Sequence, residues 1–250
     1  WFPDVNHGVL DEPRYNLIMG DGRNYELATD STYDVISVDA TSPQMAGNGS
    51  LYTLDFYELV RSHLSPQGIA VQWLPFHLLS DAQVRMTART FMEAFPHTTL
   101  WFSPLRSLGL LVGSHDRLRV DVQSLASKLQ RPGVRQQLER VGVTEPLDVL
   151  AWFVTGEKGL AKYTADARLN TDDHPYLEFT PAWSYFFATR YGAQNMYNFG
   201  FFARHSISGD LYTYLGMQDK AHQEYQKALS IDPGDKNAEH AYWRERGLPK

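Results

Sequence analysis

The chain contains no cysteine among its 250 residues. This absence excludes disulfide bonds and thiol catalysis, and it fits a protein of a reducing compartment. No apolar run approaches the roughly 18 residues that a membrane-spanning helix needs. No run of basic residues occurs either, and the formal net charge is −6, so the sequence indicates no nucleic-acid partner.

Three motifs of well-known enzyme classes are also absent. The chain has no G-x-S-x-G nucleophile elbow, no His-x-x-x-His pair for zinc and no G-x-G-x-x-G loop for a dinucleotide. The composition, with 43% hydrophobic and 21% charged residues, is ordinary for a globular protein. A chain of this length is sufficient for one large domain or two smaller ones.

The most informative stretch that is present covers residues 11–60, where two apolar runs each end on a carboxylate, Asp21 and Asp39. Continuous apolar runs are typical of strands in a parallel sheet that is buried on both faces. Ligands of open α/β sheets bind just beyond the carboxyl ends of such strands. We therefore expect Asp21 and Asp39 side by side at the mouth of one crevice, where a nucleoside cofactor and an acid/base group would lie.

The first 118 residues alternate strand and helix patterns, which favours a doubly wound α/β sheet. The predicted strands are residues 15–20, 33–39, 69–74, 98–102 and 108–113, and the last two are expected to be antiparallel. The predicted helices are residues 22–28, 51–64 and 80–95. Between them, residues 40–50 form a loop long enough to be a lid, and residues 65–68 form a turn.

The alternation of strand and helix patterns ends at His115, and we expect two further regions in the rest of the chain. Residues 119–181 would be a helical extension, with helices at 120–129, 134–141 and 146–155 and a loop that reads NTDDHP. Residues 182–250 would combine an aromatic-rich segment with a helical unit, since residues 202–235 resemble a single tetratricopeptide repeat. One repeat cannot bury its own apolar face, so this unit would pack on the aromatic segment or bind a protein partner.

The NTDDHP loop places two acids and a histidine together, at Asp172, Asp173 and His174. These residue types are metal ligands, but neighbours on an extended loop seldom converge on one ion. We interpret the sequence as an Asx-type turn ahead of Pro175 and predict no metal site.

Four blocks of sequence resemble the spermidine synthase, or polyamine aminopropyltransferase, family: DEPRYNLIMGDGRNY, YDVISVDATSP, LYTLDFYELV and SPQGIAVQW. The resemblance covers about residues 1–113 and is closest to a bacterial branch in which the domain follows a membrane-embedded segment. It implies the Rossmann-like fold of class I S-adenosylmethionine-dependent transferases. In that family a Gly-rich loop and a ribose-binding acidic residue precede the sequence that corresponds to the start of this chain. We therefore expect an N-terminally truncated chain that would be inactive by itself, from the cytoplasmic side of an inner membrane if a membrane segment lies upstream.

The resemblance also implies roles for individual residues. Asp39 would be the general base, and Asp21, flanked by Gly20 and Gly22, would accept a hydrogen bond from the adenine amino group of the co-substrate. The residues around the amine substrate would be Ser42, Tyr52 and Gln72. Each role has a structural alternative: Asp39 and Gln72 as strand-end polar groups, Asp21 as a helix N-cap, and Tyr52 as a core aromatic.

The predicted reaction transfers an aminopropyl group from decarboxylated S-adenosylmethionine to a diamine such as putrescine, without a metal. Ser42 departs from the family, which usually carries a second aspartate there, in D-x-x-D-P. Two alternatives follow: an S-adenosylmethionine-dependent methyltransferase-like enzyme, and a non-catalytic scaffold that binds a protein through the tetratricopeptide-like tail. The expected partner is a small cationic amine, and a homodimer is left open.

Overall fold

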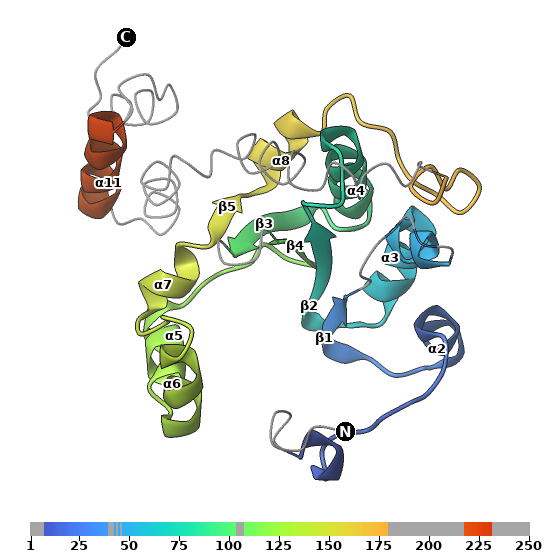
Figure 1. Ribbon diagram of the computed structural model, residues 1–250, viewed down its shortest axis with the longest axis horizontal. Helices are drawn as coiled ribbons and strands as arrows, with labels where there is room; N and C mark the ends of the chain where they lie inside the picture. The colour runs from blue at the N-terminus through green and yellow to red at the C-terminus, as the bar shows by residue number, and fades with distance from the viewer. Residues whose placement is uncertain are drawn as a thin grey trace.

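The computed structural model describes residues 8–39, 43, 45, 47–103, 108–179 and 218–231. The described residues form a five-stranded sheet with the order β1-β2-β4-β3-β5 (Figure 1). The strands are β1 (Tyr33–Val38), β2 (Leu64–Pro75), β3 (His97–Ser103), β4 (Leu108–Ser114) and β5 (Phe153–Thr155). The helical elements are η1 (Val9–Asp11), α2 (Gly22–Ala28), η2 (Asn48–Tyr52), α3 (Leu54–Ser62), α4 (Asp81–Ala94), α5 (Val122–Leu129), α6 (Pro132–Glu139), α7 (Pro146–Leu150), α8 (Glu157–Tyr163) and α11 (Gln218–Ile231). None of these helices is long and apolar enough to cross a membrane.

The sheet combines one parallel crossover with antiparallel pairs. β1 and β2 are parallel and are joined through α3, whereas β4 pairs antiparallel with both β2 and β3. The predicted α/β fold class, with two closing antiparallel strands, is therefore confirmed. Since β1 and β2 run in the same direction, their carboxyl ends meet at one edge of the sheet.

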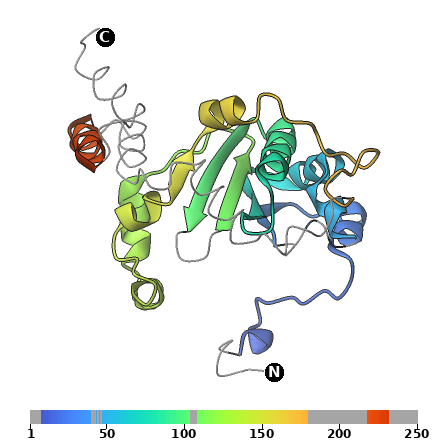
Figure 2. The same ribbon diagram turned by 45° about the horizontal axis from the view of Figure 1, so that its top comes forward.

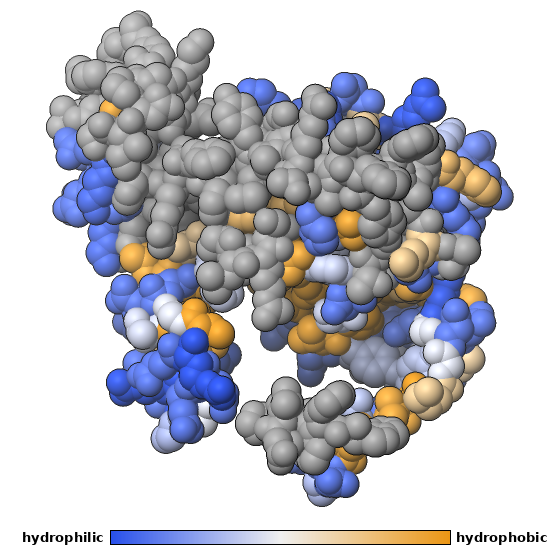
Figure 3. Space-filling model, in the orientation of Figure 1, coloured by the Kyte–Doolittle hydropathy of each residue, from blue (hydrophilic) through white to orange (hydrophobic). Residues whose placement is uncertain are grey.

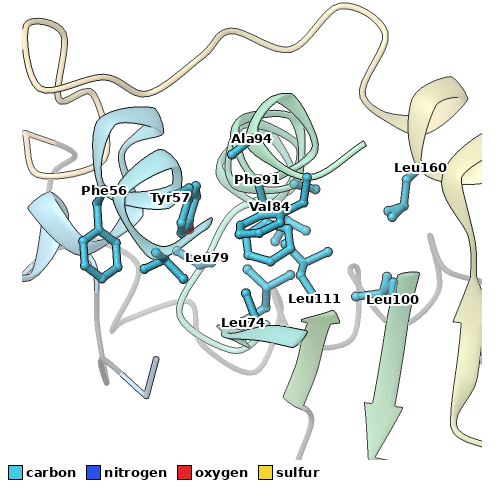
Figure 4. Close-up of a cluster of buried hydrophobic side chains, with 14 of the residues drawn as sticks. Phe56, Tyr57, Leu74, Leu79, Val84, Phe91, Ala94, Leu100, Leu111 and Leu160 are labelled. Atoms are coloured by element: carbon cyan, nitrogen blue, oxygen red, sulfur yellow. The ribbon is translucent and has the colours of Figure 1, made fainter. Parts of the chain in front are cut away.

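The core lies between one face of the sheet and the helices α3, α4 and α8 (Figures 2 and 4). Tyr57 of α3 meets Phe91 of α4 edge to face, with ring centroids 5.0 Å apart, and Phe91 lies 4.8 Å from Phe95. Such aromatic pairs stabilise beyond the area that they bury. Phe56 and Val60 of α3 are also buried in this core.

Local capping signals predicted the starts of two helices correctly. Ser80 and Gln83 form a capping box at the start of α4, so each side chain satisfies a backbone N–H of the other residue. The helix α2 begins where it was predicted, after Asp21, whose carboxylate accepts the N–H of Asn24 at 2.8 Å.

The prediction of a strand at residues 15–20 is wrong. This segment is not hydrogen-bonded to any described strand, and the exposed fractions of Leu17, Ile18 and Met19 are 55%, 50% and 85%. Figure 3 shows apolar side chains along the segment that leads to α2, which stands away from β1 in Figures 1 and 2. The run has the composition of a strand, but a strand also needs a neighbour for its backbone groups.

Two further predictions need correction. Residues 65–68 are not a separate turn but lie within β2, where the register with β1 shifts between Tyr33 and Val35. The helix predicted at 146–155 ends at Leu150 and is followed by β5 and α8, neither of which was predicted. A three-residue strand is too short to show a hydrophobic period.

The helix α11 falls within the predicted tetratricopeptide-like unit. Ala221 and Tyr225, which occupy the small and aromatic positions of that motif, are both fully buried. The rest of the unit and the aromatic-rich segment lie outside the described residues.

We predict that Gly113→Ala will lower the free energy of unfolding by about 1–3 kcal/mol, the usual cost of overpacking a core. A Cβ atom at Gly113 would lie 2.6 Å from Cγ of Phe95 and 2.8 Å from Cε1 of Phe91. Urea denaturation measures this change. The matched control is Gly133→Ala in α6, where a Cβ meets nothing within 4 Å and a gain of about 0.4–1 kcal/mol is expected. Equal stability of the two variants would show that the β4–α4 contact is not tightly packed.

Candidate functional site

Asp39 lies directly after β1, at the edge where the two parallel strands end. Its neighbour Val38 is paired with Gln72 of β2, so the two predicted site residues come from adjacent strands. The Asp39 side chain is exposed and makes no hydrogen bond within the described residues. A carboxylate without a structural partner is free to bind a ligand.

Tyr52 and Gln72 are both fully buried beside this edge. The Tyr52 hydroxyl and the Gln72 amide nitrogen both donate to the carbonyl oxygen of Trp73, at 3.4 and 3.1 Å. Burial raises the pKa of Tyr52 above its ordinary value; the charge of Asp39 adds to the shift and Gln72 opposes it. The Tyr52 hydroxyl therefore remains protonated, and the structure brings Asp39, Tyr52 and Gln72 together as predicted from the sequence.

The amide oxygen of Gln72 is the most informative atom of this group. It is buried and has no hydrogen-bond partner among the described residues. Leaving a buried acceptor unpaired costs about 1–3 kcal/mol. An N–H group of a ligand bound beside Asp39 would remove this cost.

Asp21 does not lie at a strand end, contrary to the expectation that it adjoins Asp39 through neighbouring strands. It is the N-cap of α2, which confirms the structural alternative for this residue. Its second carboxylate oxygen makes no hydrogen bond within the described residues. A Cβ atom added at Gly20 or Gly22 would meet nothing within 4 Å, and neither glycine has a positive φ. The backbone on both sides of Asp21 is therefore open, as close approach of a flat ring would require.

The connection between Asp21 and the rest of the site is made by Arg23, which the sequence analysis missed. Arg23 donates to the carbonyl oxygen of Ser50 at 2.9 Å, so it joins α2 to η2, which ends at Tyr52. Both guanidinium nitrogens also bind the carboxylate of Asp172. The hydrogen bonds from Arg23 lower the pKa of Asp172 below its ordinary value, and the charge of Arg23 adds to the shift. The only available signal for Arg23 was its place in the GDGR sequence.

Two other candidates have different outcomes. Ser42 lies outside the described residues, so its predicted role is untested. In the NTDDHP loop a turn forms as predicted, but Thr171 closes it, because the N–H of His174 binds both the carbonyl and the hydroxyl oxygen of Thr171. Across the described part of the chain, no group of three or more metal-ligating side chains lies together.

Comparisons with known proteins match the part of the chain that carries this site. Residues 1–112 match the family model described as "Spermine/spermidine synthase domain". A "Polyamine aminopropyltransferase 2" of Pseudomonas aeruginosa is 40% identical over 94 residues, 36% of this chain and 26% of that protein. A "Polyamine aminopropyltransferase" of Shigella boydii is 42% identical over 71 residues, 28% of this chain and 24% of that protein.

The chain thus spans about a quarter of the length of these curated relatives. Among solved structures, a probable spermidine synthase from Corynebacterium glutamicum aligns with a TM-score of 0.44 and 22% identity, over 64% of this chain and 55% of that one.

Proposed function

We propose that the protein is an aminopropyltransferase-like enzyme that moves an aminopropyl group from decarboxylated S-adenosylmethionine to a small diamine such as putrescine. One observation carries this proposal: Asp39 and Gln72 lie at the same sheet edge, and neither the exposed carboxylate of Asp39 nor the amide oxygen of Gln72 has a hydrogen-bond partner among the described residues. Together they offer two acceptors to one amine, and no cation among the described residues occupies either. The match of residues 1–112 to the spermine/spermidine synthase domain supports this assignment.

The chemistry requires an amine that has lost its proton. Free alkylamines are mostly protonated at neutral pH, since the comparable amine of lysine has a pKa of about 10.4. Asp39 would bind the ammonium group and accept its proton as general base, while Gln72 accepts a second N–H. The co-substrate supplies a carbon next to a sulfonium: the C–N bond forms, the C–S bond breaks, and sulfur keeps the electron pair.

The co-substrate would lie against the other half of the site. The free oxygen of Asp21 suits a hydrogen bond from the adenine amino group, and the open space at Gly20 and Gly22 leaves room for the ring. The residues present therefore fit a nucleoside at this position.

The decisive experiment supplies the full-length protein with putrescine and either decarboxylated or intact S-adenosylmethionine, and identifies the products by chromatography and mass spectrometry. We expect spermidine and methylthioadenosine from the decarboxylated form. A methylated amine from the intact form would instead support the methyltransferase alternative, which Ser42 favours because it brings no second charge to a diamine. No product from either form would support the scaffold.

Several finer points belong to the same proposal. We infer that the protein belongs to the membrane-linked branch and works at the cytoplasmic face of a bacterial inner membrane. The burial of Ala221 and Tyr225 supports a tetratricopeptide-like unit, which would bind a protein partner.

We predict that Asp21→Ser will weaken co-substrate binding while leaving α2 intact, because serine also caps helices well. Loss of a charged hydrogen bond is worth about 1.5–3 kcal/mol, or roughly a 10- to 150-fold rise in the dissociation constant. Calorimetry with the nucleoside measures the affinity, and circular dichroism checks the helix. Asp21→Ala should lose both the co-substrate affinity and the cap that stabilises α2. Unchanged affinity in Asp21→Ser would show that this residue is only a cap.

A further inference from the structure

A segment far from the site in sequence, residues 170–178, touches three of its elements. We call it the brace; it begins with the NTDDHP sequence and is the loop that passes over α3 in Figure 1. Its first residue, Asn170, is fully buried. The Asn170 amide nitrogen donates to the carbonyl oxygen of Tyr52 at 3.0 Å, and its backbone carbonyl accepts the N–H of Leu54 at 2.8 Å. The brace is therefore fixed to the turn that carries Tyr52.

The middle of the brace reaches α2. Asp172 binds both guanidinium nitrogens of Arg23, and its own N–H donates to Asp55 of α3 at 2.9 Å. Arg23 also lies over the ring of Phe56, 5.9 Å from the centroid. This single arginine thus contacts the brace, η2 and α3 at once.

The end of the brace contacts the loop that follows Asp39. The N–H of Gly47 donates to Glu178 at 3.4 Å, and a Cβ atom at Gly49 would lie 2.8 Å from Cβ of Glu178. The brace therefore approaches both ends of the segment between Gly47 and Tyr52.

The helix α2 has little else to hold it in place. It has seven residues and none of them is buried. A helix this short is not stable by itself. Its last turn is attached to β1 by the Tyr25 and Tyr33 hydroxyls, 2.8 Å apart. At its first turn, which carries Asp21, Arg23 provides the side-chain hydrogen bonds to other described elements.

The solvent exposure of the Arg23–Asp172 ion pair indicates its role. The Arg23 side chain is 19% exposed and that of Asp172 is 41% exposed. Ion pairs this open to solvent contribute little to global stability. A bidentate pair does, however, fix geometry, because two parallel hydrogen bonds orient the guanidinium.

We propose that Arg23 and Asp172 are positioning residues, which hold Asp21 in a fixed place relative to Asp39, Tyr52 and Gln72. The inference rests on the proposed function, since it assigns the pair to the nucleoside half of that site. Losing the pair should leave the amine half intact, because Tyr52 and Gln72 are anchored to Trp73 independently. The effect should therefore fall on the co-substrate alone.

The test is a double-mutant cycle of Arg23→Gln, Asp172→Asn and the double variant. Each single change should raise the KM of the nucleoside co-substrate roughly 10- to 100-fold through misplacement of Asp21, with the KM of putrescine unchanged. The double variant should be no worse than the worse single one. The matched control is Asp166→Asn, which removes another Arg–Asp pair, with Arg85 of α4, away from this site.

A second readout does not depend on turnover. Amide hydrogen exchange at residues 22–28 should accelerate in both single variants while the melting temperature stays that of the control variant. Normal wild-type activity with unchanged co-substrate KM in the variants would overturn the positioning role. Faster exchange in the two single variants, together with a wild-type protein that forms no spermidine, would instead retain the brace and reject the proposed function.

Discussion

Asp39→Asn is expected to lower kcat roughly 10²- to 10⁴-fold, the usual contribution of a general base. Asparagine keeps the shape of the side chain and its ability to bind an ammonium group weakly, but it cannot take the proton. The carboxylate is exposed and makes no hydrogen bond within the described residues, so its loss should not disturb the fold. Steady-state kinetics with putrescine, together with calorimetry of the co-substrate, should show loss of turnover with nearly unchanged nucleoside affinity.

The matched control for this prediction is Asp34→Asn. Asp34 is also an exposed aspartate of the β1 segment, but it lies at the opposite end, where it accepts a hydrogen bond from Ser65 at 2.7 Å. Its substitution should leave kcat unaltered. If Asp39→Asn keeps most of its kcat, or if the two variants lose activity equally, Asp39 is a structural residue and the proposed mechanism is wrong.

Asn170→Ala is expected to lower the free energy of unfolding by about 2–5 kcal/mol, because it leaves two buried backbone groups without partners. Those groups are the carbonyl of Tyr52 and the N–H of Leu177, which bind the Asn170 side chain at 3.0 and 3.2 Å. Urea denaturation followed by circular dichroism measures the loss.

The control for this variant is Gln137→Ala in α6, whose exposed amide accepts a hydrogen bond from Arg140. It should change stability by no more than about 0.5 kcal/mol, as is usual for surface positions. A loss in Asn170→Ala as small as that of the control would mean that the brace is not anchored by its first residue.

Much of the local structure follows from short stretches of sequence. Ser80 with Gln83, and Asp21 ahead of α2, specify helix starts through side chains that satisfy nearby backbone N–H groups. The apolar run that ends at Asp39 predicts a strand and the edge at which it ends. The candidate roles of Asp39, Tyr52 and Gln72 came from the resemblance to a family, and the structure then placed these residues together.

The sequence by itself therefore determined the α/β class, the order of most elements and the place of Asp39 at the end of β1, because each of these depends on neighbours within a few positions. The tertiary structure alone decided that β4 lies between β2 and β3, that residues 15–20 have no strand beside them, and that β5 exists. It also decided that Asp172 meets Arg23, 149 positions away, and that Asn170 supports Tyr52, 118 positions away. Pairings of this kind depend on which surfaces the whole chain buries against each other. A sequence pattern of a few residues therefore cannot predict them.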